Sequence, residues 1–154
     1  MLRIKKGESG LYITRKGQYA LFFMIELALH KGETITVKQV AGKYDLSEKY
    51  MEQVAVKLRR AGFINVIRGN HGGYYLDGNI DDYTARQIID VIDGPKNAVD
   101  VDSYKISENN RMLNSIVIDM GNKVDNAIDD VLTNVTLGDL VHSYSEQLNC
   151  SYSI

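Results

Sequence analysis

The chain has 154 residues, of which 44% are hydrophobic and 25% are charged, a balance typical of a folded globular protein that argues against intrinsic disorder. A single cysteine, Cys150, excludes an intramolecular disulfide and any metal or cluster site built only from cysteines of one chain, so we expect a reducing, cytoplasmic location. The apolar run at residues 19–29 contains Glu26 and is too short to span a membrane.

Charged residues are distributed unevenly, although the formal net charge is only -2. Through Tyr75 the chain has 13 Lys and Arg against 6 Asp and Glu, and from Leu76 onward it has 5 against 14. This asymmetry predicts a basic half that meets a polyanion and an acidic half that avoids one. The alternative is that the basic half is an ordinary solvated surface.

The first elements in chain order are three predicted helices. Residues 15–30 are apolar nearly all round, which predicts a helix buried on several sides. A capping box of Thr36 and Gln39 opens a short second helix. A tight turn at 45–47 leads to a third helix at 48–61, for which Ser47 is the N-cap. The predicted buried stripe of this third helix consists of Met51, Val54, Ala55 and Leu58.

A hairpin is predicted directly after the third helix. Residues 63–68 are rich in β-branched side chains, residues 69–73 form a glycine-rich turn, and residues 74–76 begin a return strand. A hairpin in this position is the wing of a winged helix-turn-helix. The glycine-rich turn lacks the Gly-Lys-Ser/Thr ending of a nucleotide-binding loop, and its glycines could serve the hairpin alone.

The second half is predicted to be helical. A helix opens near Thr84 and stops at Gly94-Pro95, and residues 96–105 form a polar loop. Ser107 is the predicted cap of a long helix of roughly 26 residues, and a last helix follows Thr136. The sequence thus predicts a mainly α-helical fold with a small β-hairpin, divided into a winged helix-turn-helix DNA-binding domain at 11–82 and a helical dimerisation region at 83–154.

Apolar residues of the long helix recur every three or four positions and form a stripe. A small chain has too little surface of its own to cover such a helix, which favours a homodimer seam. Gly121 is expected to let a partner backbone approach closely. The alternative is packing within the chain. The predicted dimerisation residues are Leu113, Ile116, Met120, Gly121, Val124 and Ile128.

Double-stranded DNA is the expected partner. The second helix of a helix-turn-helix enters the major groove, where Gln can pair with adenine, Glu can accept from cytosine, and Ser or Lys can bind phosphate or base acceptors. Arg68 at the base of the wing can enter a narrow minor groove, and the wing tip can hydrogen-bond phosphate. The predicted DNA-binding residues are Ser47, Lys49, Tyr50, Glu52, Gln53, Arg68, Asn70 and His71.

Some of these residues could have other roles. Glu52 could instead pair with Lys49 or Arg59. The three histidines, His30, His71 and His142, are scattered, so we expect no metal site. No motif of catalysis or dinucleotide binding is present, so we expect neither an enzyme nor a cofactor.

Four stretches, residues 13–21, 46–53, 57–62 and 66–76, resemble the Rrf2 family of bacterial transcription regulators. The resemblance includes Tyr-x-Glu-Gln at 50–53, Arg-Gly-x-x-Gly-Gly-Tyr at 68–74, and the segments 88–95 and 136–140. It implies a homodimer joined by the long helix, a pseudo-palindromic operator, base reading by Tyr50, Glu52 and Gln53, and a wing arginine at Arg68.

The sequence departs from the family pattern at two places. Gln18 stands where members usually have a basic residue, which implies the loss of a phosphate contact. Cluster-binding members have three cysteines in the loop after Gly-Pro, whereas residues 96–110 contain none. The chain therefore resembles the cluster-free branch, typified by the cysteine-metabolism repressor.

We accordingly expect a repressor without an iron–sulfur cluster. Its signal stays open between a small-molecule effector, a partner enzyme and oxidation of Cys150, although no basic neighbour lowers the pKa of that thiol. The alternatives are a winged-helix protein-interaction module that has lost DNA binding, and a regulator with a non-cysteine cofactor site.

Overall fold

The computed structural model describes residues 12–99 and 108–152, which form a mainly helical fold with one two-stranded antiparallel sheet, as predicted. The main helices and strands are α1 (Arg15–Leu29), α2 (Val37–Lys43), α3 (Glu48–Arg60), β1 (Asn65–Ile67), β2 (Gly73–Tyr75), α4 (Ala85–Asp93), α5 (Arg111–Asn134) and α6 (Leu137–Ser151). Two 3-10 turns, η1 (Ile80–Asp82) and η2 (Glu108–Asn110), precede α4 and α5.

Helix α1 is the centre of the core. It packs against α3, α4 and α6, which explains why its sequence is apolar nearly all round. Phe23 and Met24 are fully buried, and they share one hydrophobic cluster with Leu58 of α3, Ile88 of α4 and Leu137 of α6. Residues from both halves of the sequence therefore build the same core.

The helix-turn-helix consists of α2, a tight turn and α3. The Thr36 capping box is present, with its hydroxyl accepting from Gln39 N and the Gln39 side chain accepting from Thr36 N. Asp45 adopts a left-handed backbone with φ of 52°, and Leu46 N donates to Ala41 O over 2.8 Å. Asp tolerates this conformation better than most residues, so the turn can be tight.

The wing is a hairpin whose first strand is shorter than predicted. Its register pairs Asn65 with Tyr75 and Ile67 with Gly73. The prediction of a strand from residue 63 was wrong, because Phe63 N donates to Leu58 O over 3.0 Å and closes the C-terminus of α3. Phe63 therefore belongs to the helix cap, and the ladder begins two residues later.

Short pairings join two segments of the second half. Thr84 and Thr136 form an isolated antiparallel bridge, in which Ala85 N donates to Val135 O and Leu137 N donates to Tyr83 O, each over 2.8 Å. Both threonines also complete the capping boxes of the helices that follow them, α4 and α6. The starts of α4 and α6 are thus fixed beside each other.

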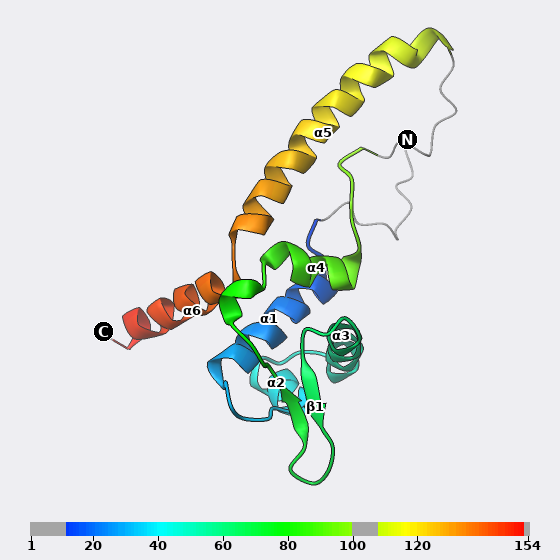
Figure 1. The fold of residues 1–154 in the computed structure, drawn as a ribbon. Coiled ribbons are helices and arrows are strands. Elements are labelled where there is room, and N and C mark those ends of the chain that lie inside the picture. Colours follow the sequence, from blue (N-terminus) through cyan, green and yellow to red (C-terminus); the bar gives the residue numbers. More distant parts are fainter. Residues whose placement is uncertain (1–11, 100–107, 153–154) are drawn as a thin grey trace.

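Helix α5 begins later than predicted. Its first residue is Arg111, and Asn110 is the N-cap but makes no side-chain capping bond. Ser107, the predicted cap, lies outside the described residues, and η2 occupies 108–110. In Figure 1, α5 projects away from the helical body, and the wing points in the opposite direction.

Candidate nucleic-acid interface

Helix α3 has one buried face and one exposed face. Its buried residues are the four predicted ones, Met51, Val54, Ala55 and Leu58. The five predicted DNA-binding residues of this segment are all exposed. These are Ser47, Lys49, Tyr50, Glu52 and Gln53.

Ser47 caps the N-terminus of α3 and is itself exposed. The Ser47 hydroxyl accepts from Tyr50 N over 3.4 Å. Because capping occupies one of the two acceptor sites of this hydroxyl, its proton remains available to a phosphate or base acceptor. The cap therefore fixes Ser47 without removing it from the predicted interface.

Glu52 has no ion pair or hydrogen bond among the described residues, so the predicted alternative of pairing with Lys49 or Arg59 is not realised. Its carboxylate lies along an open groove of about 330 Å³ between α2, α3 and the wing. The groove is lined by Thr36, Val37, Glu52, Val56, Gly73 and Tyr74. A free carboxylate here can accept a hydrogen bond from a ligand.

A basic residue of α1 joins this surface. Lys16 Nζ donates to Gln53 Oε1 over 2.9 Å and lies 5.3 Å from the centroid of the Tyr50 ring. The sequence patterns did not indicate this contact, because Lys16 and Gln53 are 37 positions apart and no pattern of spacing links them.

The wing is tied to the segment before α2. Ile35 pairs with Tyr74 through two 2.8 Å backbone hydrogen bonds, and Thr34 Oγ1 donates to His71 O over 3.2 Å. Around the tip, the predicted contact residues Arg68, Asn70 and His71 are exposed. The tip is therefore open to a ligand while its base is fixed.

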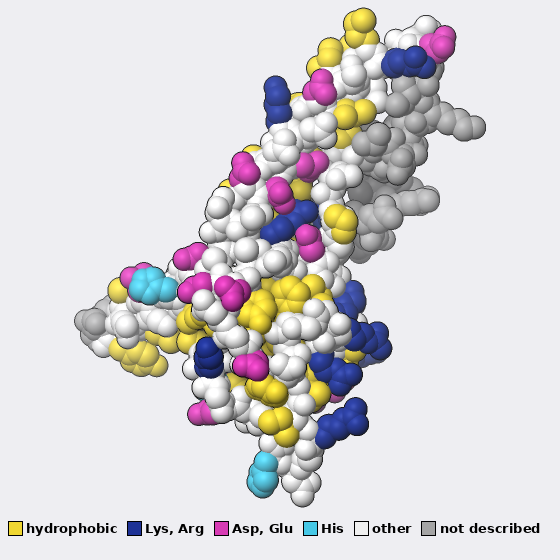
Figure 2. Space-filling model, in the orientation of Figure 1, with side chains coloured by type: hydrophobic (Ala, Val, Ile, Leu, Met, Phe, Trp, Pro, Cys, Tyr) yellow, Lys and Arg dark blue, Asp and Glu magenta, His cyan; other side chains and the backbone are white. Residues whose placement is uncertain are grey.

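The last turn of α3 contains three basic residues, one of which also holds the fold together. Lys57, Arg59 and Arg60 are all exposed, but Lys57 Nζ donates to Ile92 O over 2.9 Å and so holds the C-terminus of α4. Figure 2 shows Lys and Arg side chains gathered on one flank of the helical body, while Asp and Glu side chains line much of the projecting helix α5. The charge asymmetry of the sequence is thus also an asymmetry in space.

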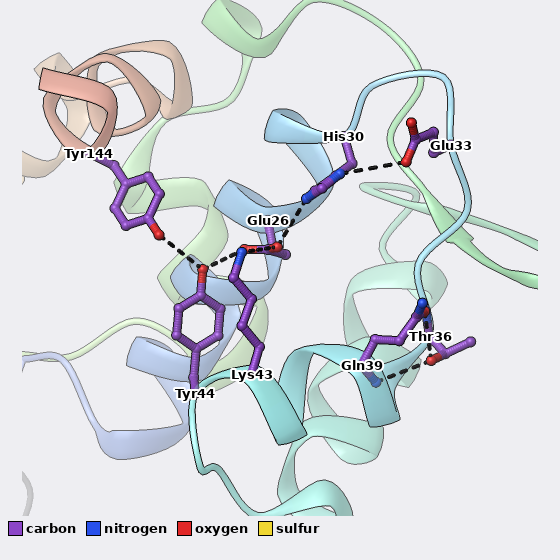
Figure 3. Close-up of polar contacts among 8 residues, drawn as sticks. All are labelled: Glu26, His30, Glu33, Thr36, Gln39, Lys43, Tyr44 and Tyr144. Carbon is purple, nitrogen blue, oxygen red and sulfur yellow. Dashed lines mark hydrogen bonds and ion pairs between the residues drawn. The ribbon is translucent and has the colours of Figure 1, made fainter. Parts of the chain in front are cut away.

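A buried polar cluster supports the helix-turn-helix from behind. The Glu26 side chain is only 4% exposed, and its carboxylate accepts from Lys43 Nζ over 2.7 Å and from Tyr44 OH over 2.5 Å, with His30 Nε2 at 3.2 Å (Figure 3). The Tyr44 hydroxyl lies 3.4 Å from that of Tyr144 in α6. The cluster therefore links α1, the end of α2 and α6.

Opposing effects act on the pKa of Glu26. Burial alone would raise the pKa, but hydrogen bonds from Lys43 and Tyr44, together with the charges of Lys43 and His30, outweigh it and lower the pKa below 4.5. Burial and the Glu26 carboxylate raise the pKa of the Tyr44 hydroxyl, so it stays protonated as the donor.

Helix α5 has one face against its own chain and an apolar face in solvent. On the first face, Asp125 Oδ1 accepts from Ala98 N over 2.7 Å, and Asp129 pairs with Arg86 of α4. Gly121 belongs to this face, because a Cβ there would clash with the Val99 side chain. The expectation that a partner backbone explains Gly121 was therefore wrong.

Ile128 is half-buried on the same inner face. The other predicted stripe residues are uncovered in the chain: Leu113 is 67% exposed, Ile116 61%, Met120 59% and Val124 42%. Packing within the chain thus accounts for one face of α5 and leaves a second, apolar face in solvent.

A recognition helix with a free polar face, a tight turn before it and a wing beside it define a winged helix-turn-helix transcription regulator. Residues 13–143 match the Rrf2 family, described as an iron-dependent transcriptional regulator. The chain belongs to the Rrf2 family, as the sequence motifs predicted.

Individual relatives agree with this assignment. The HTH-type transcriptional regulator CymR of Bacillus subtilis (strain 168) is 38% identical over 135 residues, which cover 87% of this chain and 91% of CymR. The solved structure of CymR, the global cysteine regulator of B. subtilis, superposes with a TM-score of 0.66 at 35% identity over 93% of this chain and 98% of CymR. T. potens IscR superposes with a TM-score of 0.68 at 32% identity over 90% of this chain and 91% of IscR.

The family description implies iron, and the donor set of this chain does not fit it. Within residues 12–99 and 108–152, no group of three or more His, Cys, Asp or Glu side chains is arranged to hold a metal ion. The one cysteine of the sequence, Cys150, is exposed near the end of α6, so one chain cannot supply a set of thiolates for a cluster.

No helix in the described part of the chain is long and apolar enough to cross a membrane.

Proposed function

We propose that this Rrf2-family regulator is a repressor that binds a pseudo-palindromic operator as a homodimer. The exposed face of α3 would lie in the major groove and the wing would contact the backbone and the adjacent minor groove. The observation that carries this proposal is the division of α3, whose apolar stripe is buried while Glu52 and Gln53 are exposed.

The uncovered face of α5 supports the dimer. Leu113, Ile116 and Met120 are each more than half exposed on one helix, and a second copy of the chain would bury them. We propose residues 11–82 as the DNA-binding part and 83–154 as the dimerising part. This division is one of function, because Ile88 and Leu137 lie in the same core as Phe23.

The donor set supports a regulator without an iron–sulfur cluster. The similarity to CymR agrees with this branch, and it makes promoters of cysteine-metabolism genes the first DNA to test, together with the chain's own promoter. A regulator of transcription acts on the bacterial chromosome, which places the proposed activity in the cytoplasm.

Selection from a random duplex library, followed by titration at several salt concentrations, tests the proposal. We expect enrichment of an inverted repeat whose half-sites lie about 34–36 Å apart, or a multiple of that distance. Affinity should fall steeply with salt, because phosphate contacts release counterions. Absence of any enriched sequence across all salt concentrations would contradict the proposal and favour a protein-interaction module.

A further inference from the structure

One cation on α1 contacts two neighbouring residues of the proposed reading face. Lys16 lies in the first turn of α1, and its Nζ donates to Gln53 Oε1 over 2.9 Å while lying 5.3 Å from the Tyr50 ring. An ammonium is attracted to the face of an aromatic ring, so the two contacts restrain the same Nζ from two sides. Lys16 is therefore placed to orient the Gln53 amide.

This contact changes what Gln53 can recognise. A glutamine reads adenine by accepting from the adenine amino group and donating to its ring nitrogen at the same time. In this structure the carbonyl oxygen already accepts from Lys16, and an adenine amino group would have to approach beside an ammonium of the same polarity. The two N–H donors of the amide make no hydrogen bond among the described residues.

We propose that Lys16 is a positioning residue that sets the base preference of Gln53, converting a side chain suited to adenine into a donor suited to guanine. The proposal rests on the proposed function, since it assumes that α3 reads bases. Guanine presents two acceptors in the major groove, which match the amide donors and the remaining N–H groups of Lys16.

Glu52 favours a base that donates a hydrogen bond, whereas the amide of Gln53 favours a base that accepts one. The Glu52 carboxylate has no partner among the described residues and can only accept, which suits the cytosine amino group. Adjacent positions of α3 thus present an acceptor and a set of donors. The half-site should contain a cytosine opposite Glu52 and a guanine opposite Gln53.

Binding-site selection with Lys16→Met tests the proposal, because methionine keeps the length of the side chain and removes the cation. We expect the preference for guanine over adenine at one position of each half-site to fall by roughly five- to tenfold. Lys16→Arg restores a donor and should retain the wild-type preference. Arg15→Met removes an exposed charge from the preceding position and should lower affinity equally for all sequences.

The outcomes separate the two proposals. A uniform loss of affinity with Lys16→Met, with a salt slope smaller by about one and an unchanged base preference, would make Lys16 a phosphate contact and overturn this inference alone. Absence of enrichment by the wild-type protein would overturn the proposed function and this inference with it.

A measurement without DNA tests the contact directly. In ¹⁵N-labelled full-length protein, Lys16→Met should shift the side-chain amide resonances of Gln53, whereas Arg15→Met should leave them in place. Unchanged Gln53 resonances in the Lys16→Met variant would show that the amide is not held and would overturn the inference.

Discussion

The Glu26 carboxylate is buried, charged and satisfied by partners from α1 and the end of α2. Replacing it by glutamine should destabilise the protein by about 1–3 kcal/mol, because hydrogen bonds to a buried charge are lost. Urea denaturation at neutral pH measures this change. Glu33→Gln, at a side chain that is 74% exposed, should change the free energy of unfolding by less than about 0.5 kcal/mol.

The lowered pKa of Glu26 gives this prediction a pH dependence. Since the folded-state pKa lies below the ordinary 4.5, the carboxylate contributes its full stability above pH 4.5 and loses it as the pH falls through the folded-state pKa. The difference in free energy of unfolding between wild type and Glu26→Gln should therefore shrink below pH 4.5. A difference that instead grows on acidification would contradict the lowered pKa.

Arg68 is exposed and directly follows β1 in the wing. Arg68→Ala should weaken operator binding by roughly 1–3 kcal/mol if the guanidinium makes a specific contact in the groove. Titration of the selected operator measures this loss. Arg111→Ala, which removes an exposed charge at the start of α5, is the matched control and should bind nearly as wild type does. If both variants bound the operator with the same affinity, Arg68 would not be part of the DNA interface.

Side-chain contacts between residues far apart in the chain could not be predicted from the sequence. The exposure of Glu52 and Gln53 followed from the helical period of their buried neighbours, and the structure agrees. The Glu26 cluster did not follow, because its members come from positions 26, 30, 43, 44 and 144 and only the 26–30 spacing is helical. In the sequence, Glu26 was visible only as an interruption of an apolar run.

Among the elements, the wing depends on a close backbone approach. A Cβ at Gly73 would lie 2.9 Å from Ile35 O and 3.0 Å from Ile35 N, so the two backbones must separate if Gly73 is replaced. Gly73→Ala should destabilise the protein by about 1–3 kcal/mol, as other forced shifts of a packed backbone do, and should weaken DNA binding. Thermal unfolding and operator titration measure the two effects.

Gly42 provides a control substitution that should stabilise the protein, where Gly73→Ala should destabilise it. It lies within α2 with no heavy atom within 4 Å of its would-be Cβ, so Gly42→Ala should stabilise the protein by about 0.5–1 kcal/mol through helix propensity. If both substitutions destabilised the protein equally, the close approach at Gly73 would not be the cause.

Helix starts were easier to predict than strand limits. The caps at Ser47 and Thr36 depend on residues within four positions of one another, and the structure places both as expected. The last helix also begins directly after Thr136, as predicted. The wing strands and the start of α5 were misplaced. A strand ends where its partner stops pairing, and Phe63 was taken up by the α3 cap, which propensity alone does not reveal.

The uncovered apolar face of α5 predicts that the protein is a dimer. Met120→Glu should convert the proposed dimer to a monomer, because a charge would be buried in an apolar seam at a cost of several kcal/mol. Sedimentation velocity measures the change. Asn122→Glu adds the same charge two positions away, on another side of the helix, and should leave the dimer intact.

If two copies bind the operator together, Met120→Glu should also weaken operator binding, and Asn122→Glu should not. Met120→Glu should lose most of the binding to the full inverted repeat while retaining that of a single half-site, because linked half-sites raise the effective concentration of the second contact. A dimeric Met120→Glu protein would show that this face is not the seam.

The bridge between Thr84 and Thr136 also has a consequence for synthesis on the ribosome. It joins the starts of α4 and α6, and nearly every buried member of the hydrophobic cluster precedes α5 in the sequence. Among the fully enclosed cluster members only Leu137 comes later. The DNA-binding half can thus collapse cotranslationally, and pairing of two chains through α5 becomes a later, concentration-dependent step of assembly.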